Sequence, residues 1–488
     1  MKIKTGLFLS VFVVWAAVFG ACSGTTPLVE PMVTGQPETE LLPGGADGGS
    51  SPDAGIEALA QDGRAGDAES VAAADVGQVK QLPVEIRAVW VTRWDFESAA
   101  DVEQIMKDIA AGGFNLVYFQ VRGVADAYYR STKEPWAAGL SGKLGKDPGW
   151  DPLQAAIDAA KKHDLELHAW INVSTAWKGK QRPGRSKPKH ILRTHPDWRV
   201  ADKKGRPMPY ADGYIFVNPA NPGFQKHIQA VVAELASFYS IDGLHLDYAR
   251  YPAANVSFDR PCNKLFKKAR KKDKRLTRVA WQRSQLTNLV KSLRETATKV
   301  RPTIKVSAAV TGIYKDRWNW GTVTQGFVDF HQDSHLWAAE LAVDILIPMI
   351  YWAPTKKPGR RTDYLTLIKD FEPLAKQVQL IAGVSVEAGN FLVLENEIKI
   401  ARQHAYAGIA VFSYALLKKR KWFGKLKKGV FKNKALARDK KEVIVSQAVY
   451  RPASGAADIF DYGYIVAVVT TLVDCALAGA EVVYQNID

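Results

Sequence analysis

Cysteine is scarce in this sequence, with three residues among 488, at positions 22, 262 and 475. Cysteines so few and so far apart exclude a disulfide-stapled fold and a cysteine-based zinc motif. The sequence also lacks the GxSxG nucleophile turn and the HExxH zinc motif, and no GxGxxG turn follows its first predicted strand. These absences argue against serine hydrolases, zinc proteases and dinucleotide-binding enzymes. We therefore expect neither a metal nor an organic cofactor.

The N-terminus has the pattern of an export signal. Lys2 and Lys4 precede the apolar run Leu7–Phe19, which is too short to cross a bilayer comfortably. Two small residues then lead to Cys22, an arrangement that resembles a bacterial lipobox. We therefore expect residues 1–22 to be a lipoprotein signal peptide with Cys22 lipidated, and the protein to be exported and lipid-anchored to the cell envelope, at the outer membrane or in the periplasm. Ordinary secretion with an unmodified Cys22 is the alternative.

Charge is distributed unevenly along the chain. Residues 23–80 contain no aromatic residue and ten acidic against two basic residues, which predicts a flexible acidic linker. The formal net charge is nevertheless +16, because basic residues gather in the stretches Lys178–Arg193, Lys264–Arg278 and Lys418–Glu442. The first two fall in predicted loops, where they could attract an anionic polymer. Aromatic residues are sparse in all three stretches, which disfavours nucleic acid as a partner.

From residue 85 onward, short β-branched or aromatic runs alternate with stretches of helical period. This alternation predicts an α/β fold, a (β/α)8 TIM barrel with enlarged loops over residues 85–416, and we expect a monomer. Residues 417–488 form a basic segment and a small C-terminal appendage without an assigned role. A doubly wound open sheet is the competing fold, but most of its uses need the glycine-rich turn that is missing here. The strand candidates are Ile86–Thr92, Phe114–Arg122, Glu166–Ser174, Ile241–Tyr248, Ile304–Thr311, Asp344–Trp352, Gln379–Glu387 and Gly408–Tyr414.

Polar and aromatic residues occupy the ends of several predicted strands. In a TIM barrel functional side chains lie where strands end, and residues two apart on a strand point the same way. Buried polar groups cost energy unless they are satisfied, so their convergence at one rim indicates a site. The sets that share a direction are Tyr118, Gln120 and Arg122; His168, Trp170 and Asn172; Gly243, His245 and Asp247; Met349 and Tyr351; and Ser385 and Glu387.

Carboxylates at this rim point to hydrolysis of a glycosidic bond, which needs two carboxyl groups. The acids at strand ends are Asp95, Asp126, Asp247 and Glu387. Asp247 has the strongest position, because strand alternation aligns it with His245. A buried salt bridge with a nearby arginine is the alternative for Asp247. We assign Asp247, Glu387 and Asp126 as the candidate catalytic residues.

Aromatic side chains provide the second half of a carbohydrate site, since the C–H faces of sugars stack on flat rings. Several tryptophans fall at strand ends or in the loops that follow, and part of them will be packing residues. Together with the polar residues of the strand ends they give the predicted substrate-binding set, which is Gln120, Arg122, His168, Trp170, Asn172, His245, Tyr251, Tyr351, Trp352 and Trp94.

Three segments carry a resemblance to a known family: FQVRGVADAYY (119–129), HAWIN (168–172) and DGLHLDYARYP (242–252). None of them is a generic barrel feature. They resemble the glycosyl-hydrolase-like family ten, exported bacterial barrels, and the similarity covers roughly residues 85–416. The resemblance implies a glycoside hydrolase acting on a cell-wall glycan (a peptidoglycan strand) or another polysaccharide; one characterised relative cleaves peptidoglycan strands stripped of stem peptides. The matching motif positions are Gln120, Arg122, Asp126, His168, Trp170, Asn172, His245, Asp247, Tyr251 and Tyr351.

A departure from the family pattern leaves a second hypothesis open. Many relatives have a second aspartate directly after the one that matches Asp247, and this chain has Tyr248 there. The stretch IAGVSVEAG, which contains Glu387, is also only loosely similar, so the carboxylate partner of Asp247 is not identified. The alternative is therefore a non-catalytic glycan-binding surface lipoprotein built on the same barrel.

Overall fold

The computed structural model describes residues 83–437, except Lys356, Pro358 and Arg360. The predicted signal peptide, the predicted lipidation site Cys22, the predicted acidic linker and most of the predicted C-terminal appendage lie outside the described residues. Among the helices that are described, none is both long and apolar enough to cross a membrane.

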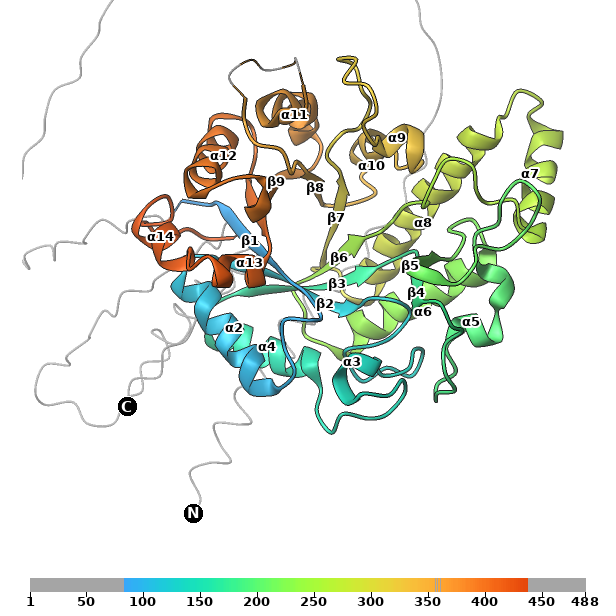
Figure 1. Ribbon diagram of the computed structural model, residues 1–488, viewed down its shortest axis with the longest axis horizontal. Helices are drawn as coiled ribbons and strands as arrows, with labels where there is room; N and C mark the ends of the chain where they lie inside the picture. The colour runs from blue at the N-terminus through green and yellow to red at the C-terminus, as the bar shows by residue number, and fades with distance from the viewer. Residues whose placement is uncertain (1–82, 356, 358, 360, 438–488) are drawn as a thin grey trace, which may run out of the picture. The chain divides into compact units, whose positions relative to one another are not determined.

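Eight parallel strands close into a barrel in the order β1-β2-β3-β6-β7-β8-β9-β10, and β10 pairs back with β1 (Figure 1). Each of them falls within a predicted strand, so the TIM-barrel prediction is confirmed. The strands are β1 (Ile86–Val91), β2 (Leu116–Arg122), β3 (Glu166–Asn172), β6 (Gly243–Asp247), β7 (Lys305–Thr311), β8 (Ile345–Met349), β9 (Gln379–Ser385) and β10 (Gly408–Phe412).

Helices alternate with the strands and begin at polar caps. Ser98 and Asp101 form a capping box at the start of the first long helix, and Asp151 and Asn221 each precede a proline that opens the next two. These side chains satisfy backbone N–H groups that a helix leaves free. The main helices are α2 (Ala99–Ala111), α4 (Pro152–Lys162), α6 (Pro222–Phe238), α8 (Arg278–Val300), α10 (Ser334–Ala339), α11 (Tyr364–Phe371) and α12 (Phe391–Gln403).

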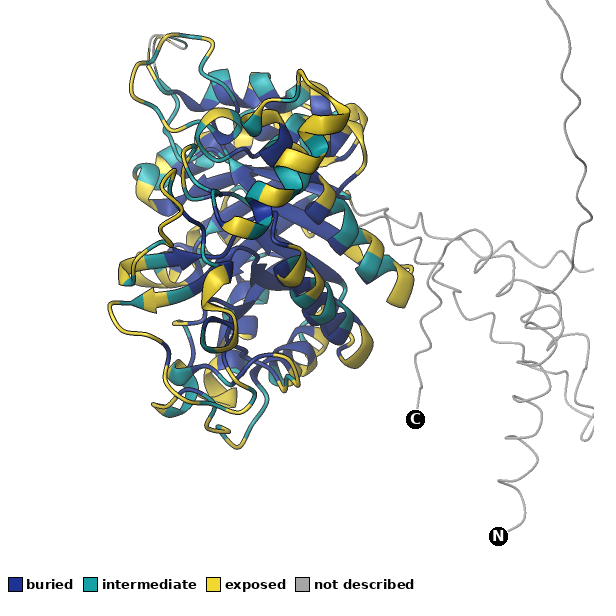
Figure 2. Ribbon diagram, turned by 90° about the vertical axis from the view of Figure 1, so that its right-hand side faces the viewer, coloured by how far each residue is buried: buried dark blue, intermediate teal, exposed yellow. Residues whose placement is uncertain are grey.

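Strand alternation divides the core into two layers. Ile86, Ala88 and Trp90 of β1 belong to a cluster inside the barrel, whereas Val89 and Val91 pack against the helices outside. Figure 2 shows the same arrangement, with buried residues in the strands and exposed ones on the outer faces of the helices. The inner layer fills the barrel between its two ends.

Two structured insertions enlarge the connections that follow β3 and β6. The first contains an antiparallel hairpin, β4 (Thr175–Gly179) with β5 (Ala211–Phe216), and the second contains α7 (Arg260–Lys272). The sequence predicted loops at both places. Alternation is short in β4 and β5. The apolar residues of α7 do follow a helical spacing, but basic residues outnumber them, and this charge favoured a loop as the prediction. The remaining short elements are α3 (Ala138–Ser141), α5 (Ile191–Thr194), η1 (Pro196–Trp198), α9 (Gly326–Asp329), η2 (Glu372–Lys376) and η3 (Val386–Ala388).

The chain continues beyond β10 and stays packed on the barrel to the end of the described residues. It forms α13 (Tyr414–Lys419) and α14 (Phe423–Lys428), and Leu436 then pairs with Val84 beside the first strand. Phe431 is fully buried and its ring contacts Phe114 edge-on. Residues 417–437 therefore close the end of the barrel where the strands begin.

Candidate active site

A cavity of about 280 Å³ opens at the carboxyl ends of the barrel strands. Half of its lining side chains are aromatic, and Asp247 is the one carboxylate among the described residues that line it. Six members of the predicted site meet there: Trp94, Gln120, Trp170, Asn172, Asp247 and Tyr351. The other lining residues were not in the predicted site: Trp90, Thr92, Tyr214, Tyr248, Arg250, Ala309, Met349 and Phe412.

Asp247 ends β6 and is 7% exposed. The backbone N–H of Tyr248 donates to its Oδ1 at 2.6 Å, whereas the nearest Arg250 nitrogen, Nη1, lies 3.9 Å from the same oxygen. Burial raises the pKa of Asp247, and the Arg250 charge, this N–H and the Trp170 indole offset the rise only in part. A raised pKa favours the protonated form of a carboxyl group, which is the form that can donate a proton to a reacting oxygen.

The backbone turns sharply directly after this carboxylate. Tyr248 has a φ of 49°, in the left-handed region that side chains other than glycine rarely adopt. The turn brings the Tyr248 ring 5.3 Å from that of Tyr214, and the Arg250 guanidinium stacks 4.2 Å from its centre. Such conformations are costly and gather at functional sites, which fits the place of Tyr248 in the cavity wall.

The floor of the cavity rests on a buried histidine. The Trp90 indole N–H donates to His245 Nε2 at 3.0 Å, and His245 Nδ1 lies 2.9 Å from Ser307 Oγ. Because Nε2 accepts, the ring is neutral and its proton is on Nδ1. Burial, with the neighbouring His168, places the pKa of His245 well below its usual range. His245 therefore holds Trp90 in place beneath the cavity and does not line it.

In the structure Arg122 lies outside the cavity, although it was predicted to bind substrate. The register shifts between Gln120 and Arg122, so that strand alternation stops at Gln120, which does line the cavity. Arg122 is instead fully buried, and its Nε and Nη2 each donate to a Glu134 oxygen at 2.8 Å. Its remaining polar contacts include the backbone oxygen of Asn172. This ion pair supports the ends of β2 and β3 from outside the cavity.

Two of the predicted catalytic acids do not line the cavity either. Asp126 is buried, and its Oδ1 accepts the backbone N–H groups of Gly123 and Val124 at 3.3 and 2.9 Å, so it shapes the turn after β2. Glu387 is exposed in η3, on the rim just beyond β9. Of the predicted acids, the structure brings only Asp247 into the cavity.

Three predicted binding residues also lie elsewhere. His168 is buried in the barrel against Gly243, where a β-carbon would collide with its ring. Tyr251 is fully buried, with its ring 5.3 Å from that of His331. Trp352 is half-buried but does not line the cavity. The contacts of His168 and Tyr251 come from other segments of the chain, so strand alternation could not have excluded these two residues.

The family is established by the match of residues 85–391 to the model of one family, described as glycosyl hydrolase-like 10. The match covers the first seven strands of the barrel and all the strand-end residues of the cavity except Phe412. The chain belongs to the glycosyl hydrolase-like 10 family. The resemblance found in the sequence is thereby confirmed.

Relatives of this glycosyl hydrolase-like 10 chain carry glycosyl hydrolase names. The chain is 27% identical over 287 residues to glycosyl hydrolase YngK of Bacillus subtilis (strain 168), covering 55% of this chain and 54% of YngK. It is 28% identical over 274 residues to glycosyl hydrolase DigH of Escherichia coli (strain K12), covering 52% and 58%. The chain thus spans little more than half the length of these relatives.

A solved structure shares the fold of this glycosyl hydrolase-like 10 barrel. The catalytic domain of beta-amylase from Paenibacillus polymyxa aligns with a TM-score of 0.50 and 11% identity, over 69% of this chain and 94% of that one. At this identity the likeness shows the fold alone. No group of three or more His, Cys, Asp or Glu side chains suited to a metal ion occurs among the described residues.

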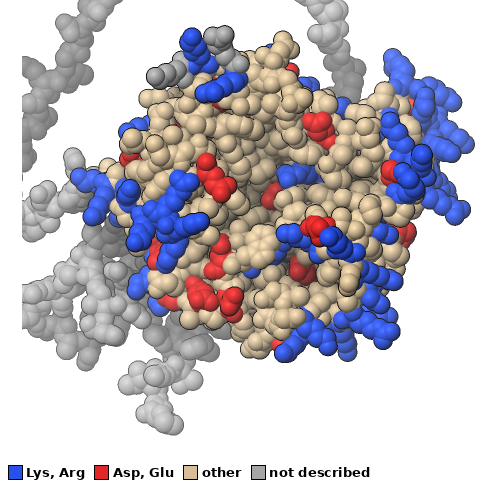
Figure 3. Space-filling view, in the orientation of Figure 1, with Lys and Arg blue, Asp and Glu red and all other residues tan. Residues whose placement is uncertain are grey.

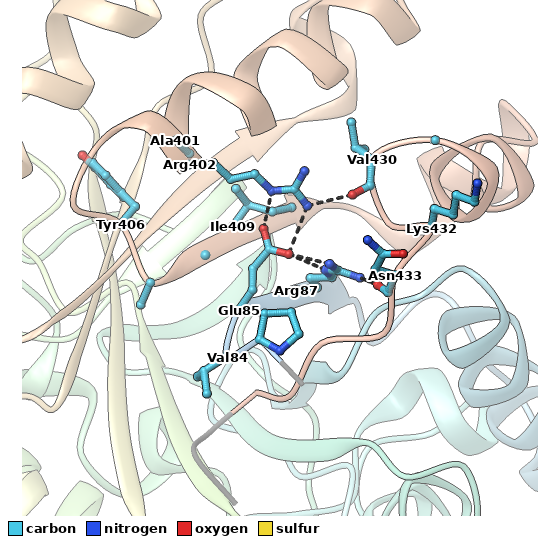
Figure 4. Close-up of a pocket in the computed structure, with 14 residues that line it drawn as sticks. Val84, Glu85, Arg87, Ala401, Arg402, Tyr406, Ile409, Val430, Lys432 and Asn433 are labelled. Atoms are coloured by element: carbon cyan, nitrogen blue, oxygen red, sulfur yellow. Dashed lines mark hydrogen bonds and ion pairs between the residues drawn. The ribbon is translucent and has the colours of Figure 1, made fainter. Parts of the chain in front are cut away.

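A second hollow of this glycosyl hydrolase-like 10 barrel lies where β1 and β10 begin (Figure 4). Its carboxylate, Glu85, is held between Arg87 and Arg402, each with an N–O distance of 2.6 Å. Burial raises the pKa of Glu85, but the two guanidinium groups outweigh it and the net pKa is lowered. A carboxylate neutralised in this way, at the end of the barrel that stabilises the fold, is structural.

Glu85→Gln should lower the free energy of unfolding by roughly 1–3 kcal/mol near neutral pH, because it leaves the buried Arg87 without its anion. Since the folded-state pKa is lowered, this stabilisation is present above the ordinary glutamate pKa and is lost as pH falls through the folded value. Urea unfolding of both proteins along a pH series measures the difference. Glu103→Gln, which breaks the exposed pair with Lys162, is the control and should change little. An equal effect of the two substitutions would contradict the structural role.

Proposed function

We propose that this chain is an exported glycoside hydrolase that cleaves a bacterial cell-wall glycan, with the peptidoglycan strand as its first candidate substrate. The observation that carries the proposal is the buried carboxyl group of Asp247, with its raised pKa, in an aromatic-walled cavity at the functional end of the barrel. Family membership and the glycosyl hydrolase names of its relatives support the same reaction.

In the proposed reaction Asp247 protonates the glycosidic oxygen as the bond to the anomeric carbon breaks. Trp94 and Tyr351 offer flat faces for the sugar rings, and Gln120 and Asn172 can hydrogen-bond to their hydroxyl groups. The side-chain amide of Gln120 donates to Asn172 Oδ1 at 3.3 Å, which fixes both groups relative to each other. The site therefore combines a proton donor with stacking and polar recognition.

The second carboxylate of the proposed reaction comes from the rim. Glu387 follows β9, which lies between the strands that carry Tyr351 and Phe412 into the cavity. From this place it could activate a water molecule or attack the sugar once a glycan fills the mouth. Asp95, after β1, is the alternative, since its Oδ2 accepts the backbone N–H of the cavity residue Thr92 at 2.7 Å. Separate Glu387→Gln and Asp95→Asn substitutions distinguish the two.

Export and anchoring complete the proposal and rest on the sequence alone. The basic start, the short apolar run and Cys22 would place a lipid at the N-terminus, and residues 23–80 would space the barrel from the membrane. A lipid-anchored enzyme of the envelope would meet wall glycans directly.

A second candidate function is non-catalytic glycan binding by the same lipoprotein. Two observations favour it: only one carboxylate lines the cavity among the described residues, and Tyr248 stands where many relatives have a second aspartate. Incubating the purified protein with peptide-free peptidoglycan strands and measuring new reducing ends separates the two functions. Release of reducing ends supports the hydrolase, and saturable binding without release supports the receptor.

Trp94→Ala should raise the KM for peptide-free glycan strands by about three- to tenfold and change kcat little, because stacking on an aromatic ring is worth about 0.5–1.5 kcal/mol. Trp94 is 62% exposed at the cavity wall, so its loss should not unfold the barrel. Steady-state kinetics measures the effect. Phe238→Ala is the control, because this equally exposed ring ends α6 at the opposite end of the barrel. An unchanged KM for Trp94→Ala would remove this residue from the binding site.

A further inference from the structure

Beyond the cavity, α7 carries a strongly basic surface that the proposed reaction does not use. Figure 3 shows Lys and Arg side chains gathered over this helix at one edge of the molecule. Asp273 is the single acidic residue of the segment 264–278, and its Oδ1 accepts the backbone N–H of Arg275. The exposed cations of this segment are Lys264, Lys267, Lys268, Arg270, Lys271, Lys272, Lys274 and Arg275.

A groove of about 770 Å³ runs along this helix, and none of its lining residues is acidic. Lys267, Arg270, Lys271 and Lys274 line one side. Their spacing of three, one and three residues places the first three on one face of the helix, and Lys274 extends the row just past its end. No ion pair joins any of these four side chains to a carboxylate of the described part of the chain. The positive charge of the groove is therefore available to an outside anion.

The base of the groove is a fixed cation. The Arg278 guanidinium carbon lies 4.8 Å and 4.9 Å from the ring centres of Phe258 and Phe266 and 5.0 Å from that of Trp281. Its Nη2 donates to the backbone oxygen of Ser257, and its buried Nε has no partner. Aromatic rings on three sides hold this charge in one position, which lowers the entropy cost of binding an anion there.

We propose that the α7 groove binds an anionic glycan, whose carboxylate or phosphate groups pair with the row of cations. A long acidic polymer matches a groove with several cations at regular spacing better than a small ion does. This inference rests on the proposed function, because it assigns the groove to a stretch of the same polymer that enters the cavity.

Two other anionic partners fit the groove less well. A helix that docks on a lipid surface exposes apolar side chains to the bilayer, but Cys262 and Phe266 of α7 face Trp281 and pack into the protein. Single-stranded nucleic acid needs free aromatic faces for its bases, and Arg278 covers those of Phe258 and Phe266. An acidic glycan held through its charged groups needs neither feature.

The segment that carries α7 follows a strand of the cavity and is anchored on the insertion after β3. The connection that carries α7 leaves β6 directly after Asp247. It is held by Asn218 Nδ2, which donates to Ser257 Oγ at 2.7 Å, and by the Phe258 N–H, which donates to the Ala201 oxygen at 3.1 Å. A polymer bound along α7 would thus raise the local concentration of its neighbouring units at the cavity.

The test is the affinity of the purified protein for fluorescent polygalacturonate and polyphosphate, which present carboxylates and phosphates respectively, with dextran as the neutral polymer. Lys267→Glu/Lys271→Glu should weaken binding of at least one polyanion by at least about tenfold at physiological salt, because it removes two charge-assisted hydrogen bonds and adds two repelling carboxylates. Lys427→Glu/Lys428→Glu, on the exposed face of α14, is the matched control and should change binding less than about twofold. Arg270→Gln/Lys274→Gln repeats the test by removing two positive charges without introducing carboxylates.

Equal losses in the α7 and α14 variants, or no loss in either, would overturn the groove assignment. The protein could instead bind phosphatidylglycerol vesicles or a DNA oligonucleotide more tightly than either polyanion, and lose this binding in the same α7 variants. That result would overturn the assignment of a glycan as the ligand of the groove. Asp247→Asn should bind both polyanions like the wild type. Binding at α7 without any cleavage of glycan strands would support the groove assignment and refute only the proposed hydrolase.

Discussion

Asp247→Asn should lower kcat for reducing-end release from peptide-free peptidoglycan strands by on the order of 10²–10⁴-fold, because the amide cannot donate the proton that the departing oxygen needs. The two side chains have nearly the same shape, so the thermal stability should remain close to that of the wild type. Loss of the buried carboxyl group could even stabilise the fold slightly, since burial opposes its ionisation. Kinetics and a melting curve on the same preparation measure both effects.

Asp126→Asn is the matched control for this loss. Asp126 lies in the turn after β2 and is equally buried, but its carboxylate accepts backbone N–H groups and does not line the cavity. The substitution should leave kcat within a few-fold of the wild type. If Asp247→Asn is folded and retains wild-type turnover, Asp247 is not the proton donor.

The second large effect is expected on stability, at the ion pair beneath the ends of β2 and β3. Glu134→Gln should cost about 3–5 kcal/mol of unfolding free energy near neutral pH, because it leaves Arg122 buried without an anion. Both side chains are fully buried, and His227 Nε2 adds a contact to Glu134 Oε1 at 3.0 Å. Urea unfolding monitored by circular dichroism measures the loss.

The pH dependence of this loss follows from the same contacts. Burial raises the pKa of Glu134, but Arg122 and His227 outweigh it and lower the pKa to about 2. The stabilisation is therefore complete above the ordinary glutamate pKa and is lost as pH falls toward 2, so the difference between wild type and Glu134→Gln should shrink on acidification. Glu340→Gln, in an exposed pair with Lys291, is the control. A loss below about 1 kcal/mol for Glu134→Gln would contradict the role of the pair.

Short-range sequence patterns were sufficient to predict the barrel and the residues at the centre of its site. Alternation along each strand is a local property, and it placed Gln120, Trp170, Asn172 and Asp247 on inward-facing strand ends. All four line the cavity. Tyr351 and Trp94 follow from the same reasoning applied just beyond a strand end.

The residues that were missed, and those predicted residues that lie outside the cavity, depend on partners far away in the sequence. Arg122 follows a register shift, so it does not point into the cavity and is paired with Glu134 instead. Tyr214 reaches the cavity from the β4–β5 hairpin, an insertion with no strong period. Trp90 was not predicted, because a tryptophan in the middle of an apolar strand is typical of the core. In the structure His245 holds its ring at the bottom of the cavity. No short-range pattern encodes these contacts.

The most direct test of Asp247 as the proton donor is the pH dependence of kcat/KM in the wild type and in Arg250→Gln. A general acid acts in its protonated form, so activity should fall as pH rises through the pKa of Asp247. The Arg250 charge lowers that pKa in part, and its removal should move the alkaline limb to higher pH by about one unit or more. An alkaline limb that stays in place, or that moves to lower pH, would show that another group supplies the proton.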